Sequence, residues 1–456
     1  MPFENEFATG ESLISLDVAL ETSRAFREFR GKVRVQAPPG ESGVPHVLSV
    51  RRRSWTPPRV IAFDGSNIPV ALVNGFPMAE ASLVKVAVVS VDLSRLSGLP
   101  EEEIPSPRVF YEMEKAHTFD LILPGANVDH PDLPDDTPRK YFREAVFDAF
   151  DAKLDDRHET LLETMRAIVG DSRAGRPPAC PVEGCEERLG PGVGAYTCNC
   201  PRSALLFETD SLRFAERFNE VSTNGEAHGE VRHVLEVISL LNMLRYFAKD
   251  RAKLRYLRDA VFILDGPLAL FGHPAWLTLY VRRELRRINA LCQAEGFQMA
   301  VFGYEKSGAF VEHFDRLDMC PERGPRGKHP RGTAFAPDAA YINRNIVLRP
   351  ADATPHGDAT YFGRKLFYKT SSGGHAVITT AMVNEASEDF RRCDEECFPR
   401  LGDMLDVLDH LATHLHRDGF MPLVRAHAHA AIPLRRGADI IRTLFRDVAN
   451  GTPAAP

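Results

Sequence analysis

The sequence predicts an α/β protein in which helices flank a mixed β-sheet. Two short apolar runs, 60–63 and 260–264, are rich in β-branched and aromatic residues, and an Asp-Gly pair follows each run. Runs of this length that end at such a pair are typical of buried strands. Between them, 229–257 repeats apolar residues at the spacing of one broad helix face. Buried strands interleaved with long helices indicate the α/β class.

Apolar periodicity predicts the remaining elements. A helix followed by a short strand is expected over 12–36, and further helices at 139–151, 158–169, 277–295, 384–416 and 437–449. Strands are expected at 68–73, 84–91, 298–303, 346–348, 366–368 and 377–380. A strand that ends at Asp64 and turns back at Gly65-Ser66 into its neighbour is the start expected for an RNase H-like mixed sheet.

These elements divide the chain into five parts. They are an N-terminal helix and strand extension (1–45), the first part of an RNase H-like core with a helical insertion (46–170), a cysteine-rich insertion (171–215), the remainder of the core (216–450) and a disordered tail (451–456).

Composition limits the classes of protein that this chain can represent. A chain of 456 residues is too long to fold around one simple core. Its fractions of hydrophobic residues (44%) and charged residues (26%) are ordinary for a soluble globular protein. Charge or glycine interrupts the longest apolar stretches, so none is long enough to span a membrane. The acidic N-terminus does not resemble a secretory signal, and we expect a cytoplasmic protein. A net charge of −7 argues against a protein that coats nucleic acid, but it is compatible with a nuclease.

The two Asp-Gly pairs support two interpretations. Asp-Gly is the commonest turn dipeptide, so each pair by itself favours a simple turn at the end of a strand. A carboxylate fixed beside the core needs a compensating charge, however. Asp64 and Asp265 together therefore suggest one divalent metal site assembled by the fold.

Four of the eight cysteines cluster in a segment dense with glycine and proline. Cys180, Cys185, Cys198 and Cys200 have the pattern C-x4-C-x12-C-x-C. Two close pairs separated by a loop suit a tetrahedral Zn²⁺ site of four thiolates, which would be structural because no coordination position stays open. Two disulfides and a chance grouping are the alternatives, and a reducing compartment disfavours the disulfides. Just after this segment, Asp210 and Arg213 are expected to form an ion pair.

Several motifs, in their order along the chain, resemble NurA-type nucleases in their longer bacterial form. They are Phe63-Asp64-Gly65-Ser66, the helix segment His233-Val-Leu-Glu236, Ile263-Leu264-Asp265-Gly266-Pro267, Gly303-Tyr-Glu-Lys306-Ser-Gly308 and Arg425-Ala426-His427. The cysteine-rich segment also resembles that longer form. The resemblance extends over roughly residues 55 to 450.

The resemblance implies a catalytic metal site in an RNase H-like core. Asp64, Glu236, Asp265 and His427 correspond to the family's metal-binding and catalytic set, with Glu230 left as an alternative to Glu236. Such ligands suit a pair of Mg²⁺ or Mn²⁺ ions that flank a scissile phosphate.

The roles of two residues, Lys306 and His427, each have two alternative interpretations. Lys306 is either a catalytic group that holds a phosphate or the attacking water, or an exposed turn lysine. His427, without the resemblance, could equally be a helix histidine with no role. A tyrosine that some members place before this histidine is absent, since the nearest aromatic residue is Phe420.

The resemblance also implies partners. NurA-type nucleases form homodimers that process DNA together with HerA-like hexameric ATPases. The chain has no Gly-x4-Gly-Lys-Ser/Thr loop, so ATP-driven translocation would have to come from such a partner. DNA end processing in repair and anti-phage defence both remain open, as does RNA cleavage. The alternative is a catalytically silent clamp or adaptor subunit of the translocase complex.

Overall fold

The computed structural model describes two units of the chain separately. Its described residues are 23–32, 43–73, 79–93, 114–130, 137–170, 180, 185, 187, 193–199, 203–413, 419–431 and 443. The first unit, residues 1–43, contains the described helix α2 (Arg24–Lys32). The second unit, residues 44–456, holds every other element named below. No helix among the described residues is both long enough and apolar enough to cross a bilayer.

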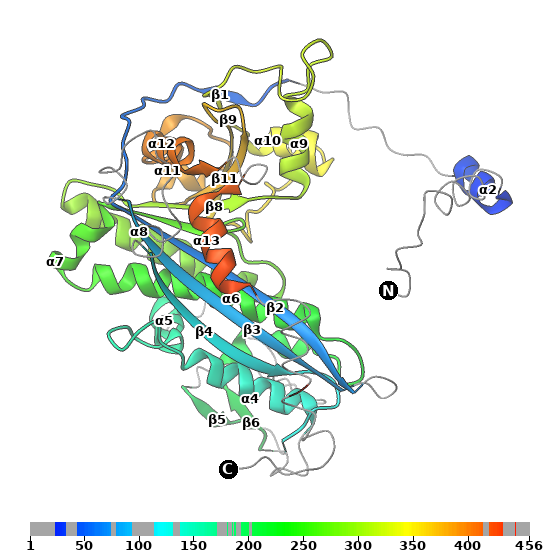
Figure 1. Ribbon diagram of the computed structural model, residues 1–456. Helices are drawn as coiled ribbons and strands as arrows, with labels where there is room; N and C mark the ends of the chain where they lie inside the picture. The colour runs from blue at the N-terminus through cyan, green and yellow to red at the C-terminus, as the bar shows by residue number, and fades with distance from the viewer. Residues whose placement is uncertain are drawn as a thin grey trace. The chain divides into compact units, whose positions relative to one another are not determined.

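In the described part of the chain, the core is one nine-stranded mixed sheet (Figure 1). Its order is β1-β9-β10-β11-β8-β7-β2-β3-β4. The central strands β2 (Arg59–Val73), β7 (Ala260–Asp265) and β8 (Ala300–Glu305) run parallel to one another. Antiparallel strands flank them: β3 (Ala79–Asp92) and β4 (Glu114–Pro124) on one side, and β11 (His375–Ala381), β10 (Gly363–Lys369), β9 (Ala334–Ala336) and β1 (His46–Leu48) on the other.

Helices cover both faces of this sheet and bury two separate apolar cores. One face packs against α4 (Pro138–Phe150), α5 (Leu161–Val169), α6 (Gly225–Ala248) and α8 (Thr278–Ala294). The other face packs against α12 (Leu401–Leu411) and α13 (Met421–Ala430), and Figure 1 shows α13 lying across the long strands β2 and β3. Alternation along β2 divides its side chains, with Ile61 and Phe63 in the first core and Val60 and Ala62 in the second.

Shorter helices complete the described unit. They are α7 (Arg251–Leu254), α9 (Ala309–Leu317), α10 (Ala339–Ile342) and α11 (Glu385–Glu388). Two small hairpins lie outside the main sheet, β5 (Ala195–Thr197) with β6 (Leu205–Phe207) and β12 (Ala412–Thr413) with β13 (Gly419–Phe420).

The predicted fold class is confirmed, because a mixed sheet with helices on both faces is what the structure contains. The strand boundary at Asp64 is wrong. β2 does not turn at Gly65-Ser66 but continues to Val73, paired with β3 along its length. Tertiary pairing therefore overrides the turn preference of the Asp-Gly pair. The second pair behaves as expected, since β7 ends at Asp265.

Three other predicted boundaries differ from the structure, and a fourth prediction is not tested. Residues 343–347 form one turn of π-helix instead of a strand at 346–348. The helix predicted at 229–257 is α6, which begins at Gly225 and ends at Ala248 before the short α7. The stretch 384–416 holds two separate helices, α11 and α12. The helix predicted at 437–449 lies almost entirely outside the described residues.

Candidate metal centre

Two aspartates meet where β2 and β7 run side by side. In the parallel register Phe63 lies opposite Leu264, so the next residues, Asp64 and Asp265, are neighbours. Asp64 is 4% exposed in the interior of β2, whereas Asp265 ends β7 and is partly exposed. Both side chains lie on the sheet face that α13 covers, because they follow Val60 and Ala62, and Val261 and Ile263, in alternation.

A histidine from the C-terminal part of the chain completes this cluster. Nδ1 of His427 lies 3.0 Å from Oδ2 of Asp64. Helix α13 presents it because Leu423, Ala426 and Ala430 are buried, and because Ser66 donates a hydrogen bond to the Ala430 carbonyl oxygen. One ligand atom each of Asp64, Asp265 and His427 lies within 4.8 Å of the others. His429, two residues on, is not part of that cluster.

Glu236 approaches Asp64 from the opposite face of the sheet, through the space that Gly65 leaves. A Cβ atom on Gly65 would collide with Oε1 of Glu236 and would also lie 3.1 Å from the Lys85 carbonyl oxygen. Glu236 is buried at 1% exposure on α6, and its negative charge acts on Asp64. The glycine of the first Asp-Gly pair therefore makes room for a third carboxylate instead of forming a turn.

Two neighbours on α6 hold Glu236 in place. Nη1 of Arg232 donates to Oε1 of Glu236 at 2.6 Å and to the Gly65 carbonyl oxygen at 2.8 Å. His233 lies between Oε2 of Glu236, at 3.2 Å, and the Ala269 carbonyl oxygen, at 2.8 Å. The sequence analysis gave neither residue a role, although their positions four and three residues before Glu236 place them on the same helix face.

The alternative glutamate, Glu230, is engaged elsewhere. Its Oε1 lies 2.7 Å from Nε of Arg217, and its other oxygen lies 4.0 Å from His273. A Cβ atom on Gly272 would also collide with it. Of the two glutamates, Glu236 is the one whose charge acts on Asp64, although it is not part of the group of ligand atoms that Asp64, Asp265 and His427 form.

Burial and like charge dominate the electrostatics of the cluster. Burial, together with the negative charges of Asp265 and Glu236, raises the pKa of Asp64 to about 8, while Lys306 opposes this rise. A hydrogen bond with Asp265 contributes in the same direction as burial. Three carboxylates in one buried place are stable in their ionised form only beside a compensating cation. Oxygen-rich donor sets with one imidazole fit Mg²⁺ or Mn²⁺.

Lys306 contacts the cluster through Asp265. It follows β8, and its Nζ donates to Oδ2 of Asp265 at 2.7 Å. Its side chain is 39% exposed, so it is reachable from solvent as well. The structure thus connects this lysine to a predicted metal ligand.

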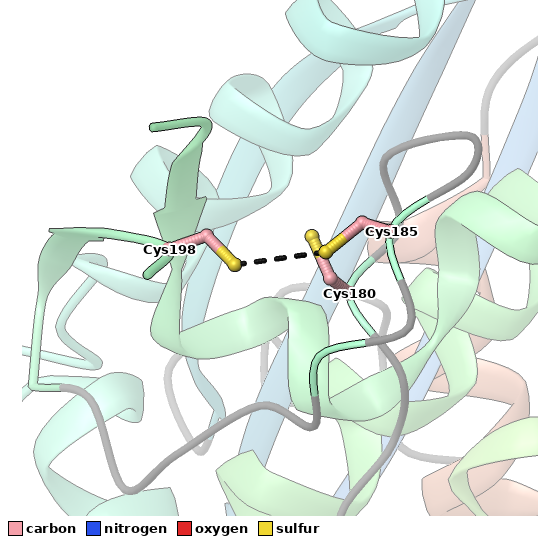
Figure 2. A group of neighbouring side chains, drawn as sticks. All are labelled: Cys180, Cys185 and Cys198. Atoms are coloured by element: carbon pink, nitrogen blue, oxygen red, sulfur yellow. Dashed lines mark hydrogen bonds between the residues drawn. The ribbon is translucent and has the colours of Figure 1, made fainter. Parts of the chain in front are cut away.

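Three of the four predicted zinc ligands converge in the cysteine-rich segment. Figure 2 shows Cys198, next to β5, facing Cys180 and Cys185 from a separate stretch of chain. The three Sγ atoms lie within 4.8 Å of one another, and those of Cys185 and Cys198 are 3.8 Å apart. Two thiolates on one tetrahedral zinc ion, with Zn–S bonds of about 2.3 Å, stand about 3.8 Å apart. The spacing fits a shared Zn²⁺ and excludes a disulfide in this geometry. Cys200 lies outside the described residues.

One predicted ion pair outside the cluster is wrong. Asp210 does not pair with Arg213 but forms a buried bidentate pair with Arg143, at 2.6 and 2.8 Å. Arg213 instead binds Glu216. Arg143 comes from α4, a partner that sequence spacing gave no means of finding.

The described fold is a helix-flanked mixed sheet with a carboxylate and imidazole cluster beside its central parallel strands. No protein-family model matches the chain, and no curated protein does. Among solved structures, the chain is similar to the NurA nuclease from Sulfolobus solfataricus, with 11% identity and a TM-score of 0.33, covering 98% of this chain and 96% of that one. A second NurA structure has 9% identity and a TM-score of 0.20, with 96% of each chain covered. Since both TM-scores are below 0.5, the function proposed below is based on the site.

We expect Gly65→Ala to separate cation binding from folding. The added methyl must displace the flexible end of Glu236 from Arg232 and His233, which weakens Mn²⁺ binding by roughly tenfold or more and lowers the free energy of unfolding by only about 1–2 kcal/mol. Calorimetric Mn²⁺ titration and urea unfolding measure the two effects. Gly225→Ala is the matched control, because the nearest atoms to its Cβ lie at 3.9 and 4.0 Å. Unchanged Mn²⁺ affinity in Gly65→Ala would remove Glu236 from the site.

Cys198→Ser should release zinc from the purified protein. Elemental analysis is expected to give about one zinc per wild-type chain and much less in the variant, because one of four thiolates is lost. Cys320→Ser is the control, since Cys320 is a partly exposed free thiol outside the cysteine cluster. Equal zinc content in both variants would contradict the site.

Proposed function

We propose that this protein is a metal-dependent deoxyribonuclease that hydrolyses phosphodiester bonds. The observation that carries the proposal is the convergence of Asp64, Asp265 and His427 within 4.8 Å, with Glu236 reaching Gly65 from the other face of the sheet. Buried carboxylates gathered in this way need a cation, and such cations act on phosphodiesters. The expected substrates are DNA ends and single strands.

The chemistry divides between the cation and the residues of the chain. Mg²⁺ or Mn²⁺, when bound, supplies an activated water and stabilises charge on the leaving oxygen. Asp64 and Asp265 would hold the metal, and Glu236, fixed by Arg232 and His233, would complete the ligand set.

His427 and Lys306 supply functions that the carboxylates lack. The ring of His427 is 63% exposed, so it can either ligate a second ion or transfer a proton to the leaving 3′ oxygen. Lys306 neutralises Asp265 and offers a positive charge to a phosphate.

We further propose that the nuclease acts with a HerA-like hexameric ATPase, in DNA end processing or in anti-phage defence. The sequence lacks a phosphate-binding loop of its own for ATP, so translocation requires a separate motor. The competing proposal is a silent DNA clamp or adaptor. The pairing of the buried Asp64 with Asp265 argues against it, because a protein without metal chemistry gains nothing from holding two acidic groups together.

Asp64→Asn should abolish cleavage and leave folding intact. The substitution removes one metal ligand and relieves repulsion with Asp265 and Glu236, so the free energy of unfolding should stay equal or rise. The assay measures cleavage of linear and single-stranded DNA in Mn²⁺ or Mg²⁺, with and without the HerA-like ATPase. Chelation by EDTA should stop the wild-type reaction and added Mn²⁺ should restore it.

Asp156→Asn, in an exposed loop, is the control for the Asp64 variant. Equal activity of Asp64→Asn and wild type would remove Asp64 from the mechanism. DNA or ATPase binding without cleavage in any wild-type condition would support the adaptor instead. Cleavage of RNA in preference to DNA would contradict the proposed substrate but would still support the proposed metal site.

We expect the protein to be a homodimer. Size-exclusion chromatography with light scattering should give twice the mass of the chain at micromolar concentration. A monomer under these conditions would contradict the proposed assembly, while the cleavage assay above would still test the nuclease.

A further inference from the structure

A cavity lies at the opposite end of the central strands from the metal centre. It encloses about 550 Å³ and is lined by the starts of β2 and β7, by β3 and β4, by the 155–158 loop, and by the end of α6 with α7 and the helical turn after it. Arg59 and Asp64 are five residues apart on β2, which places them roughly 17 Å from each other. Arg59 and Ile61 line the cavity, whereas Asp64 alternates to the other face of the sheet. The cavity is therefore separate from the metal centre.

Positive charge dominates the lining. Arg59, Lys115, Arg157 and Lys253 border the cavity. Among the described residues, Arg59 and Lys115 have no carboxylate partner, so their charges are available to a ligand. The two acidic lining residues are already engaged: Asp155 accepts from Arg157 at 2.6 Å, and Asp259 accepts from Arg258 at 2.9 Å. The cavity thus favours an anion.

Aromatic rings stand beside these cations. Tyr256 is 49% exposed, and the Arg59 guanidinium lies 5.6 Å from its ring centroid. Nζ of Lys253 lies 4.2 Å from the ring centroid of Tyr246. Flat aromatic surfaces beside cationic groups are the combination that binds a base and its phosphate.

The cavity wall also contains a buried histidine with an unfilled hydrogen-bonding position. His158 is 6% exposed, lies tilted against Tyr246 with 4.2 Å between ring centroids, and places Nδ1 2.7 Å from Oδ1 of Asp155. Its Nε2 has no hydrogen-bond partner in the described structure. With Nδ1–H directed to the carboxylate, Nε2 is a buried acceptor inside the cavity wall.

We propose that this cavity binds a nucleotide, with the base stacked on Tyr256 and the phosphate held by Arg59 and Lys115. Its volume is within the range of small-molecule sites. The same chemistry is offered by a free nucleotide and by one nucleotide of a single strand. The proposal does not depend on nuclease activity, because the two sites share no residue.

The test is calorimetric titration of the full-length protein in EDTA, where no cleavage takes place. The probes are dAMP, adenosine, inorganic phosphate and a short oligothymidylate. Saturable binding of dAMP, with weaker binding of adenosine and of phosphate, is expected. Tyr256→Ala and Lys115→Ala should each weaken binding by at least about fivefold. Both side chains are exposed, so the fold should tolerate these changes.

Two control variants distinguish binding in this cavity from binding elsewhere on the protein. Arg251→Ala removes an exposed arginine of α7 that pairs with Glu295 outside the cavity, and it should leave binding unchanged. Asp64→Asn should also leave it unchanged, whatever that substitution does to cleavage. Binding of oligothymidylate alone, weakened by Tyr256→Ala, would assign the site to a strand. Three results would overturn the proposal. They are no binding of dAMP or oligothymidylate, equal affinity for phosphate and dAMP, and an affinity that Tyr256→Ala does not change.

Discussion

Repulsion among three carboxylates, two of them buried, is the constraint on which the site depends. Asp64, Asp265 and Glu236 converge where two parallel strands meet, and the pKa of Asp64 rises to about 8 because burial and its neighbours oppose its charge. The chain compensates two of the three: Lys306 binds Asp265, and Arg232 binds Glu236. Asp64 contacts the exposed ring of His427, and the charge of Lys306 offsets only part of the repulsion. A divalent cation at Asp64 would supply the missing charge, so the arrangement is more stable with a metal than without one.

The sheet supplies the rigidity that this crowding requires. Asp64 lies in the interior of a long strand that is paired with β3 on one side and with β7 on the other up to Phe63. Because β7 ends at Asp265 while β2 continues, the second aspartate is fixed by a strand end and remains accessible. Gly65 then lets Glu236 approach from the other face without breaking the ladder. Donors held on strands and a helix keep their positions better than donors on loops.

Local patterns predicted much of this arrangement, and tertiary context explains the rest. The apolar run before Asp265 identified β7 and its end, and the broad apolar face identified α6. The Asp-Gly pair at Asp64 led to a wrong prediction of a turn. The pairing of β2 with β3 and the approach of Glu236 are long-range interactions, which a local turn preference cannot predict. The Arg143–Asp210 pair was missed for the same reason, since its partners are 67 residues apart. Arg232 and His233 were predictable in principle, because helical spacing alone places them beside Glu236.

His427 differs from the carboxylates in how it reaches the site. It lies 363 residues from Asp64 in the chain, on a short helix that packs through Leu423, Ala426 and Ala430. Two of these three are alanines, which bury little apolar area and so contribute little to holding the helix in place. The carboxylates, by contrast, are fixed by the central sheet and by α6. Metal binding through the aspartates and the function of the imidazole are therefore separable, because a shift of α13 would remove His427 while leaving Asp64, Asp265 and Glu236 where they are.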